Sequence, residues 1–288
     1  MPFTLSHAAA ALPGIRPDGT GRGPLLPSAL VAGTLAPDLT YYAASAAPAA
    51  MELGAHTHSP AGVLTVDVLL AAALVGMWLL LRAPLAALLP RRRQDRAYAL
   101  LRGGTWRGRP PASLAARFWL SAALGAATHA FWDSFTHADR WGVRQVPLLA
   151  EEALGVPLHH QLQYGSSAVA LVVLAVFLRR AWRRLPDSPP PAGLPVLAAP
   201  VRRWAVALAA GAAVAGAAHR CARRAAAEPG LAWDGYLPTA LFGAGAGLVP
   251  ALVVFAVVVH AVHAARARRS GGRPDEAGAD RPPAVPRT

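Results

Sequence analysis

Long apolar segments constrain the fold of this 288-residue chain more than any other feature. Hydrophobic residues make up 54% of the sequence and charged residues only 15%, which is too apolar for an ordinary soluble domain. Five segments have the length and hydropathy of membrane-spanning helices: residues 62–81, 114–131, 164–178, 204–218 and 237–262. The sequence therefore predicts an all-α fold, a polytopic membrane helix bundle in contact with a lipid bilayer.

Arginine placement predicts how these helices are oriented. The chain has no lysine, and its 28 arginines divide unevenly between the loops. Residues 82–117 hold nine, residues 179–203 hold six and the tail from residue 266 holds six, whereas the alternate loops share the remaining seven. The positive-inside rule then makes the arginine-rich side and the C-terminus cytoplasmic. Because the arginines follow the loops, the net charge of +13 does not indicate nucleic-acid binding.

The N-terminal region is apolar over residues 25–51 but is interrupted by Ala36-Pro37-Asp38, which breaks a helix. Two interpretations remain. A full membrane span would place His7 in the cytoplasm, whereas a re-entrant or interfacial hairpin would keep His7 on the outer side. We favour the hairpin, because a carboxylate in mid-membrane needs a partner.

Composition divides the chain into four parts. Residues 1–180 form a membrane core, and residues 181–203 form an arginine- and proline-rich cytoplasmic linker. Two further transmembrane helices fill residues 204–265. The polar residues 266–288 are predicted to be a disordered cytoplasmic tail.

His129, Asp133 and His137 are the most informative polar residues, because spacings of four place them on one face of a helix. In the predicted topology they share the outer side with other ionisable groups: His7, Asp38, His56, His58, Asp67, His159 and His160. Imidazole and carboxylate groups from different segments are the usual ligands of Zn²⁺ or another divalent metal. The single cysteine, Cys221, excludes a cysteine cluster.

Simpler roles exist for several of these residues. His129 and Asp133 would also pair with each other across one helical turn, and His137 would be a solvated loop residue. Asp67 lies about one and a half turns inside the first predicted span, where a carboxylate needs a partner. That partner is either His58 or a metal.

The same residues carry a resemblance to a family of bacterial multi-pass membrane proteins, domain of unknown function 4184. The matching pieces, in order along residues 1–180, are Met1 to Ala10, Ala36-Pro37-Asp38, Thr57-His58-Ser59-Pro60-Ala61-Gly62 with Asp67, Thr128 to His137, and Leu162-Gln163-Tyr164-Gly165-Ser166-Ser167. The last two spans look like a variable extension. The resemblance implies location in the bacterial cytoplasmic (inner) membrane.

The order of these pieces is also similar to inner-membrane proteins predicted to be metal-dependent hydrolases. That similarity implies metal ligands at His7, Asp38, His58, His129 and Asp133. The hydrolase-like proteins carry another histidine four residues before the Thr-His-Ser histidine, where this chain has Gly54. His56 is a possible substitute.

The hypothesis is therefore a membrane protein with an outward-facing divalent-metal site, acting as a hydrolase of an ester or phosphodiester if it is an enzyme. Asp67 or His137 would then orient ligands or act as the base. Two alternatives use the same residues. One is a non-catalytic protein with a structural polar cluster, and the other is a proton or metal transporter with Asp38, Asp67 and Asp133 as relay groups.

Overall fold

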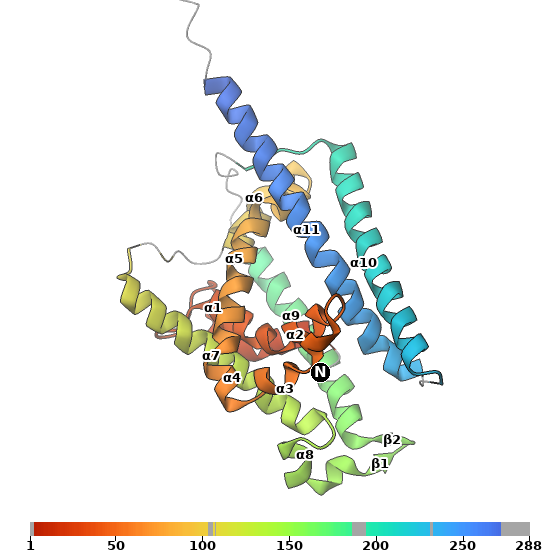
Figure 1. Cartoon of the computed structure of the whole chain (residues 1–288). Helices are drawn as coiled ribbons and strands as arrows, with labels where there is room; N and C mark the ends of the chain where they lie inside the picture. Colours follow the sequence, from red (N-terminus) through yellow and green to blue (C-terminus); the bar gives the residue numbers. More distant parts are fainter. Residues whose placement is uncertain (1–2, 103–105, 107, 186–193, 231–232, 272–288) are drawn as a thin grey trace, which may run out of the picture.

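The computed structural model describes residues 3–102, 106, 108–185, 194–230 and 233–271. Across these residues the protein is mostly helical, with eleven α-helices (Figure 1). They are α1 (Pro27–Leu35), α2 (Leu39–Ala43), α3 (Gly54–Thr57), α4 (Pro60–Leu64), α5 (Val66–Ala87), α6 (Arg91–Arg102), α7 (Pro111–Thr136), α8 (Trp141–Gln145), α9 (Leu158–Arg184), α10 (Ala199–Ala227) and α11 (Trp233–Gly271). Short 3-10 helices occupy η1 (Thr4–Gly14), η2 (Ala36–Asp38), η3 (Pro48–Met51) and η4 (Pro147–Ala150), and β1 (Glu152–Ala153) pairs with β2 (Val156–Pro157) in an antiparallel hairpin.

Four helices in the described part are long and apolar enough to cross a membrane: α5, α9, α10 and the Gly235–Arg266 part of α11. The helices α9, α10 and α11 contain three of the five predicted spans. α5 covers residues 66–81 of the first predicted span, whose first residues lie in α4. The fifth, residues 114–131, is helical within α7 but is not among these four. The reason lies in its sequence, because α7 carries Arg117, His129 and Asp133.

The N-terminal apolar region is broken at Ala36-Pro37-Asp38, as predicted, where η2 separates α1 from α2. At about 1.5 Å per residue, the nine residues of α1 extend about 14 Å, well short of a bilayer of about 30 Å. This region therefore does not form a single membrane-spanning helix.

The helices after residue 180 extend beyond the apolar segments seen in the sequence. α9 continues to Arg184 and α10 begins at Ala199, so both helices extend into the predicted linker. α11 continues to Gly271 and so includes the first residues of the predicted tail. Residues 186–193 and 272–288 lie outside the described residues.

Helices α1 and α7 cross at very short distance, and glycine makes this possible. A Cβ atom at Gly33 would lie 2.2 Å from the Ala122 carbonyl oxygen, and one at Gly125 would lie 2.2 Å from that of Leu30. Only a residue without a side chain fits at either position. The crossing fixes the end of α1, and the Asp38 segment that follows it, against the half of α7 that carries His129.

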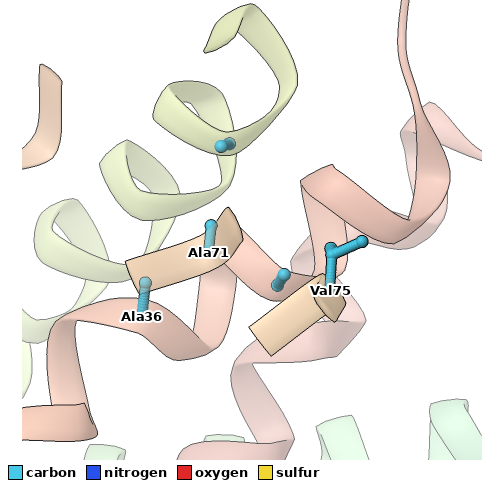
Figure 2. Close-up of a cluster of buried hydrophobic side chains, with 5 residues drawn as sticks. Ala36, Ala71 and Val75 are labelled. Carbon is cyan, nitrogen blue, oxygen red and sulfur yellow. The ribbon is translucent and has the colours of Figure 1, made fainter. Parts of the chain in front are cut away.

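An apolar cluster fills the space beside this crossing. It consists of Ala32, Ala36, Ala71, Val75 and Ala122, and Val68, Leu70, Leu74, Trp106 and Phe118 pack around it. Figure 2 shows Ala36 close to Ala71, where α5 passes the α1–η2 segment. The small side chains let the three helices α1, α5 and α7 approach one another.

Helices α10 and α11 form an antiparallel pair along one side of the molecule (Figure 1). A Cβ at Gly216 would lie 2.3 Å from the Gly243 carbonyl oxygen, and one at Gly247 would lie 2.0 Å from that of Ala212. The pair is attached to the core through Arg220, which donates hydrogen bonds to the Tyr41 carbonyl and the Ser45 hydroxyl.

The arginine-rich segments gather at one end of the molecule. α6, the start of α10 and the end of α11 lie at that end in Figure 1. Arg202 at the start of α10 donates to the Leu89 carbonyl between α5 and α6, at 3.3 Å. This arrangement agrees with alternating arginine-rich loops; which side of the membrane they face stays a prediction.

The α1–α7 crossing gives a first test. Gly125→Ala places a methyl group against backbone atoms of α1, and overpacking of this kind costs about 1–3 kcal/mol of stability. Gly76→Ala in α5 is the matched control, because nothing lies within 4 Å of the place that its Cβ would occupy. We expect a lower thermal unfolding midpoint in detergent for Gly125→Ala only. Equal midpoints for the two variants would contradict the close crossing.

Candidate metal centre

Five ionisable side chains converge in the interior from four separate segments. His7 comes from η1, Asp38 from η2, His58 from the end of α3, and His129 and Asp133 from α7. We call them the His/Asp cluster. The side chains are almost fully buried, with exposed fractions between 0% and 4%. Burial of so many charged or polar groups is costly unless they compensate one another.

The distances between histidine nitrogens and carboxylate oxygens in the cluster run from 3.5 to 3.9 Å for His58 and His129. His129 Nε2 lies 3.5 Å from Asp38 Oδ1 and 3.5 Å from Asp133 Oδ2. His58 Nε2 lies 3.6 Å from the same Asp133 oxygen and 3.9 Å from the same Asp38 oxygen. These distances exceed ordinary hydrogen bonds. They are close to the distance of about 3.4 Å that separates two ligand atoms of a tetrahedral metal site when each metal–ligand bond is about 2.1 Å.

The ligand atoms of Asp38, His58, His129 and Asp133 all lie within 4.8 Å of one another, so this buried group has the donors to hold a metal ion. His7 approaches the remaining side of Asp133, with its Nε2 3.3 Å from Oδ1. The His7 ring also stacks on that of His129, with centroids 3.6 Å apart. The sequence-predicted ligands are therefore neighbours in space.

The imidazole rings are held so that one nitrogen is left for a ligand. His129 Nδ1 lies 2.8 Å from the Thr34 carbonyl oxygen, and His58 Nδ1 lies 2.8 Å from that of Gly54. A carbonyl only accepts, so each Nδ1 carries a proton and Nε2 is the nitrogen that faces the carboxylates. The Nε2 atoms of His7, His58 and His129 are buried without a hydrogen-bond partner. Carbonyl-bound Nδ1 with a bare Nε2 is the usual state of metal-binding histidine.

Hydrogen bonds also orient Asp38. Thr4 Oγ1 donates to Asp38 Oδ2 at 2.6 Å, which leaves Oδ1 to face the histidines. Thr57 Oγ1 donates to the Pro37 carbonyl at 2.8 Å and so fixes the backbone next to Asp38. Sequence reasoning did not identify Thr4 or Thr57 as positioning residues, although both lie in the family-like motif pieces and within a few residues of a predicted ligand.

Without a bound ion the electrostatic environment differs between the members of the cluster. Burial would lower the pKa of His129, but the charges of Asp38 and Asp133 outweigh it and raise that pKa to about 10, so metal binding would displace a proton from His129. Burial, together with the neighbouring His129, lowers the pKa of His7 to about 4, so this imidazole is neutral at pH 7. Burial would raise the pKa of the Asp38 carboxyl, but the charge and hydrogen bond of His129 outweigh it and hold that pKa at about 2. Asp38 is therefore an ionised carboxylate at neutral pH.

The two predicted assisting residues lie around the cluster rather than within it. Asp67, in the first turn of α5, is fully buried, and both its carboxylate oxygens lack a hydrogen-bond partner. It does not pair with His58, and its electrostatic partner is His129. His137 lies at the surface end, with a side chain 38% exposed and its Nδ1 3.6 Å from Asp133 Oδ2. Its Nε2 lies 3.3 Å from Gln163 of α9.

The glycine at position 54 has a structural reason. A Cβ there would lie 2.5 Å from the Tyr41 ring, so no histidine fits in this packing. His56 does not replace it, because His56 is exposed and outside the cluster. His159 is also not a member; its Nδ1 bonds the Leu149 carbonyl at 2.9 Å. Ser59 caps α4 by accepting from the Gly62 amide, as the simpler interpretation predicts.

The Thr57 hydroxyl gives a second test. Thr57→Val leaves the buried Pro37 carbonyl without this donor, which costs about 1–3 kcal/mol. The control is Thr65→Val, whose exposed hydroxyl bonds only the Ala61 carbonyl. We expect a drop in the unfolding midpoint in detergent for Thr57→Val alone, and a similar small change in both variants would disprove the role of Thr57.

Comparison with known proteins identifies the family. The model of a family described as a domain of unknown function, DUF4184, matches residues 1–257, so the chain belongs to this family. The match includes α10 and most of α11, which corrects the expectation that the last two spans are a variable extension. No curated protein and no solved structure matches the chain.

Proposed function

We propose that this member of the DUF4184 family is a membrane metalloprotein whose His/Asp cluster holds one divalent cation, Zn²⁺ or a similar ion. The observation that carries the proposal is the orientation of three buried Nε2 atoms, all without hydrogen-bond partners, around two carboxylates. Asp38, His58, His129 and Asp133 are the proposed ligands. His7 completes the set from the Oδ1 side of Asp133.

Charge supports a divalent ion. With its histidines neutral, as metal binding requires, the cluster has two carboxylates and a charge of about −2, which one divalent cation would neutralise. The mixed nitrogen and oxygen donors suit Zn²⁺, Mn²⁺ or Fe²⁺ better than the all-oxygen preferences of Ca²⁺ and Mg²⁺. A buried cluster of this kind is therefore stabilised most by an ion of that class.

We further propose that the centre hydrolyses an ester or phosphodiester. A bound ion of this class would lower the pKa of a water molecule and would polarise the scissile ester or phosphodiester group. His137 lies at the exposed edge of the centre, where a substrate would enter and be oriented. Asp67 would accept the proton, because its buried carboxylate has no other hydrogen-bond partner.

Transport is the less favoured alternative. The apolar cluster lies next to the polar residues on both α5 and α7. On α5, Ala71 is one turn after Asp67, and on α7, Ala122 is about two turns before His129. A relay through Asp38, Asp67 and Asp133 would need polar groups or water in that direction. Closure on this side favours catalysis, or a purely structural centre, over a path across the membrane.

Metal content is the direct test. Protein purified in detergent and dialysed should contain about one divalent ion per chain by elemental analysis, and His58→Ala should lose it. His56→Ala is the matched control, because this exposed histidine lies two residues away and outside the cluster. Circular dichroism establishes that both variants fold. Equal and negligible metal in the wild type and both variants would refute the metal centre.

Hydrolysis is tested separately with bis(4-nitrophenyl) phosphate and 4-nitrophenyl acetate. We expect chelator-sensitive turnover, and a reduction of about 10²–10⁴-fold in rate for Asp67→Asn with its metal retained. Asp139→Asn, at an exposed position, should keep the wild-type rate. If metal-loaded protein hydrolyses neither compound, the metal centre does not catalyse hydrolysis of these two substrate classes. Its role would then be structural.

A further inference from the structure

A polar hollow lies at the arginine-rich end of the molecule, away from the His/Asp cluster. It has a volume of about 490 Å³ and is lined by Arg92, Arg93 and Arg96 of α6 and by Trp182 of α9. Neither the His/Asp cluster nor its proposed chemistry involves these residues. The volume is within the range of about 300–1,000 Å³ that is common for small-molecule sites.

The charge of this hollow is strongly positive. α6 contains five arginines and one aspartate, and four more arginines lie between positions 179 and 184 of α9, around Trp182. Among the described residues, Arg92 and Arg93 have no carboxylate within ion-pair distance. Guanidinium groups bind phosphate through paired hydrogen bonds, so the hollow suits an anion of that type.

The scaffold of the hollow is fixed to the ends of the candidate spans. Gln94 Nε2 donates to the Leu89 carbonyl at 2.8 Å and to the Ala87 carbonyl at 3.3 Å, which holds α6 against the end of α5. The apolar part of α9 ends at Leu178, so Trp182 lies one turn beyond it. Tryptophan and arginine at this level are typical of the lipid headgroup region.

A neighbouring hollow repeats the same pairing. It is lined by Pro200, Arg203, Trp204 and Ala207 at the start of α10, another candidate span. Arg202 connects that helix to the α5–α6 turn. Arginine therefore lies beside tryptophan near the ends of two candidate spans, α9 and α10, a pairing that is typical of the lipid headgroup region.

We propose that the hollow between α6 and α9 binds the phosphate headgroup of an anionic phospholipid. Arg92 and Arg93 would contact the phosphate oxygens, and Trp182 would pack beside the glycerol and upper acyl region. Charge complementarity and position at the ends of the spans select this occupant over a soluble phosphate compound. The site is independent of the proposed metal centre.

The test compares two double variants of α6 with equal loss of charge. Arg92→Gln with Arg93→Gln removes arginines that line the hollow, and Arg91→Gln with Arg102→Gln removes exposed arginines of the same helix that do not. Native mass spectrometry of the detergent-purified protein with added phosphatidylglycerol or phosphatidylcholine measures the binding. We expect phosphatidylglycerol to be preferred, and its binding to be about 10- to 30-fold weaker in the first variant only.

Three outcomes would overturn the proposal. Equal weakening in both double variants indicates general attraction to a basic helix, without a specific site. Equal binding of phosphatidylglycerol and phosphatidylcholine excludes selection of the anionic headgroup. Complete competition by millimolar inorganic phosphate assigns the hollow to a soluble anion instead of a lipid.

Discussion

Burial of two carboxylates, Asp38 and Asp133, is the constraint on which the rest of this structure depends. Each is almost completely withdrawn from solvent, and an isolated charge in such a place is strongly unfavourable. The surrounding segments supply hydroxyl groups, imidazoles and backbone carbonyls in orientations that make the burial tolerable. Thr4 occupies the outer oxygen of Asp38, and the histidines face the inner one.

The close crossing of α1 and α7 meets that constraint from the backbone side. Because Gly33 and Gly125 allow backbone contact, the end of α1 brings the Thr34 carbonyl to His129. The same close crossing places η2, and with it Asp38, opposite the His129 ring. The Thr34 carbonyl fixes the orientation of that ring. A local packing feature of two glycines therefore determines which imidazole nitrogen faces the carboxylates.

Sequence reasoning identified much of this arrangement, but not all of it. Hydropathy and length predicted the helices α5, α9, α10 and α11, because each of them is an apolar run. The fifth predicted span failed this criterion since α7 carries buried polar groups that hydropathy counts as unfavourable. Helical spacing associated His129 with Asp133. Arginine placement put His7, Asp38 and His58 on the same side as this pair, and the order of family-like motifs implied that they are ligands. No spacing rule predicts that Tyr41 excludes a side chain at Gly54, because that contact joins distant segments.

The His/Asp cluster and the α6–α9 hollow carry charges of opposite sign. At the His/Asp cluster, negative groups are buried, and one imidazole proton would balance only one of the two carboxylates. A divalent cation would balance both and would satisfy the Nε2 lone pairs of three imidazoles. At the α6–α9 hollow, positive groups are exposed, and a lipid phosphate balances them without burial. The apolar cluster of α1, α5 and α7 lies along the helices that lead away from the carboxylates and shields them from that basic end. This separation explains why the polar centre can be compact and desolvated in a chain with a net charge of +13.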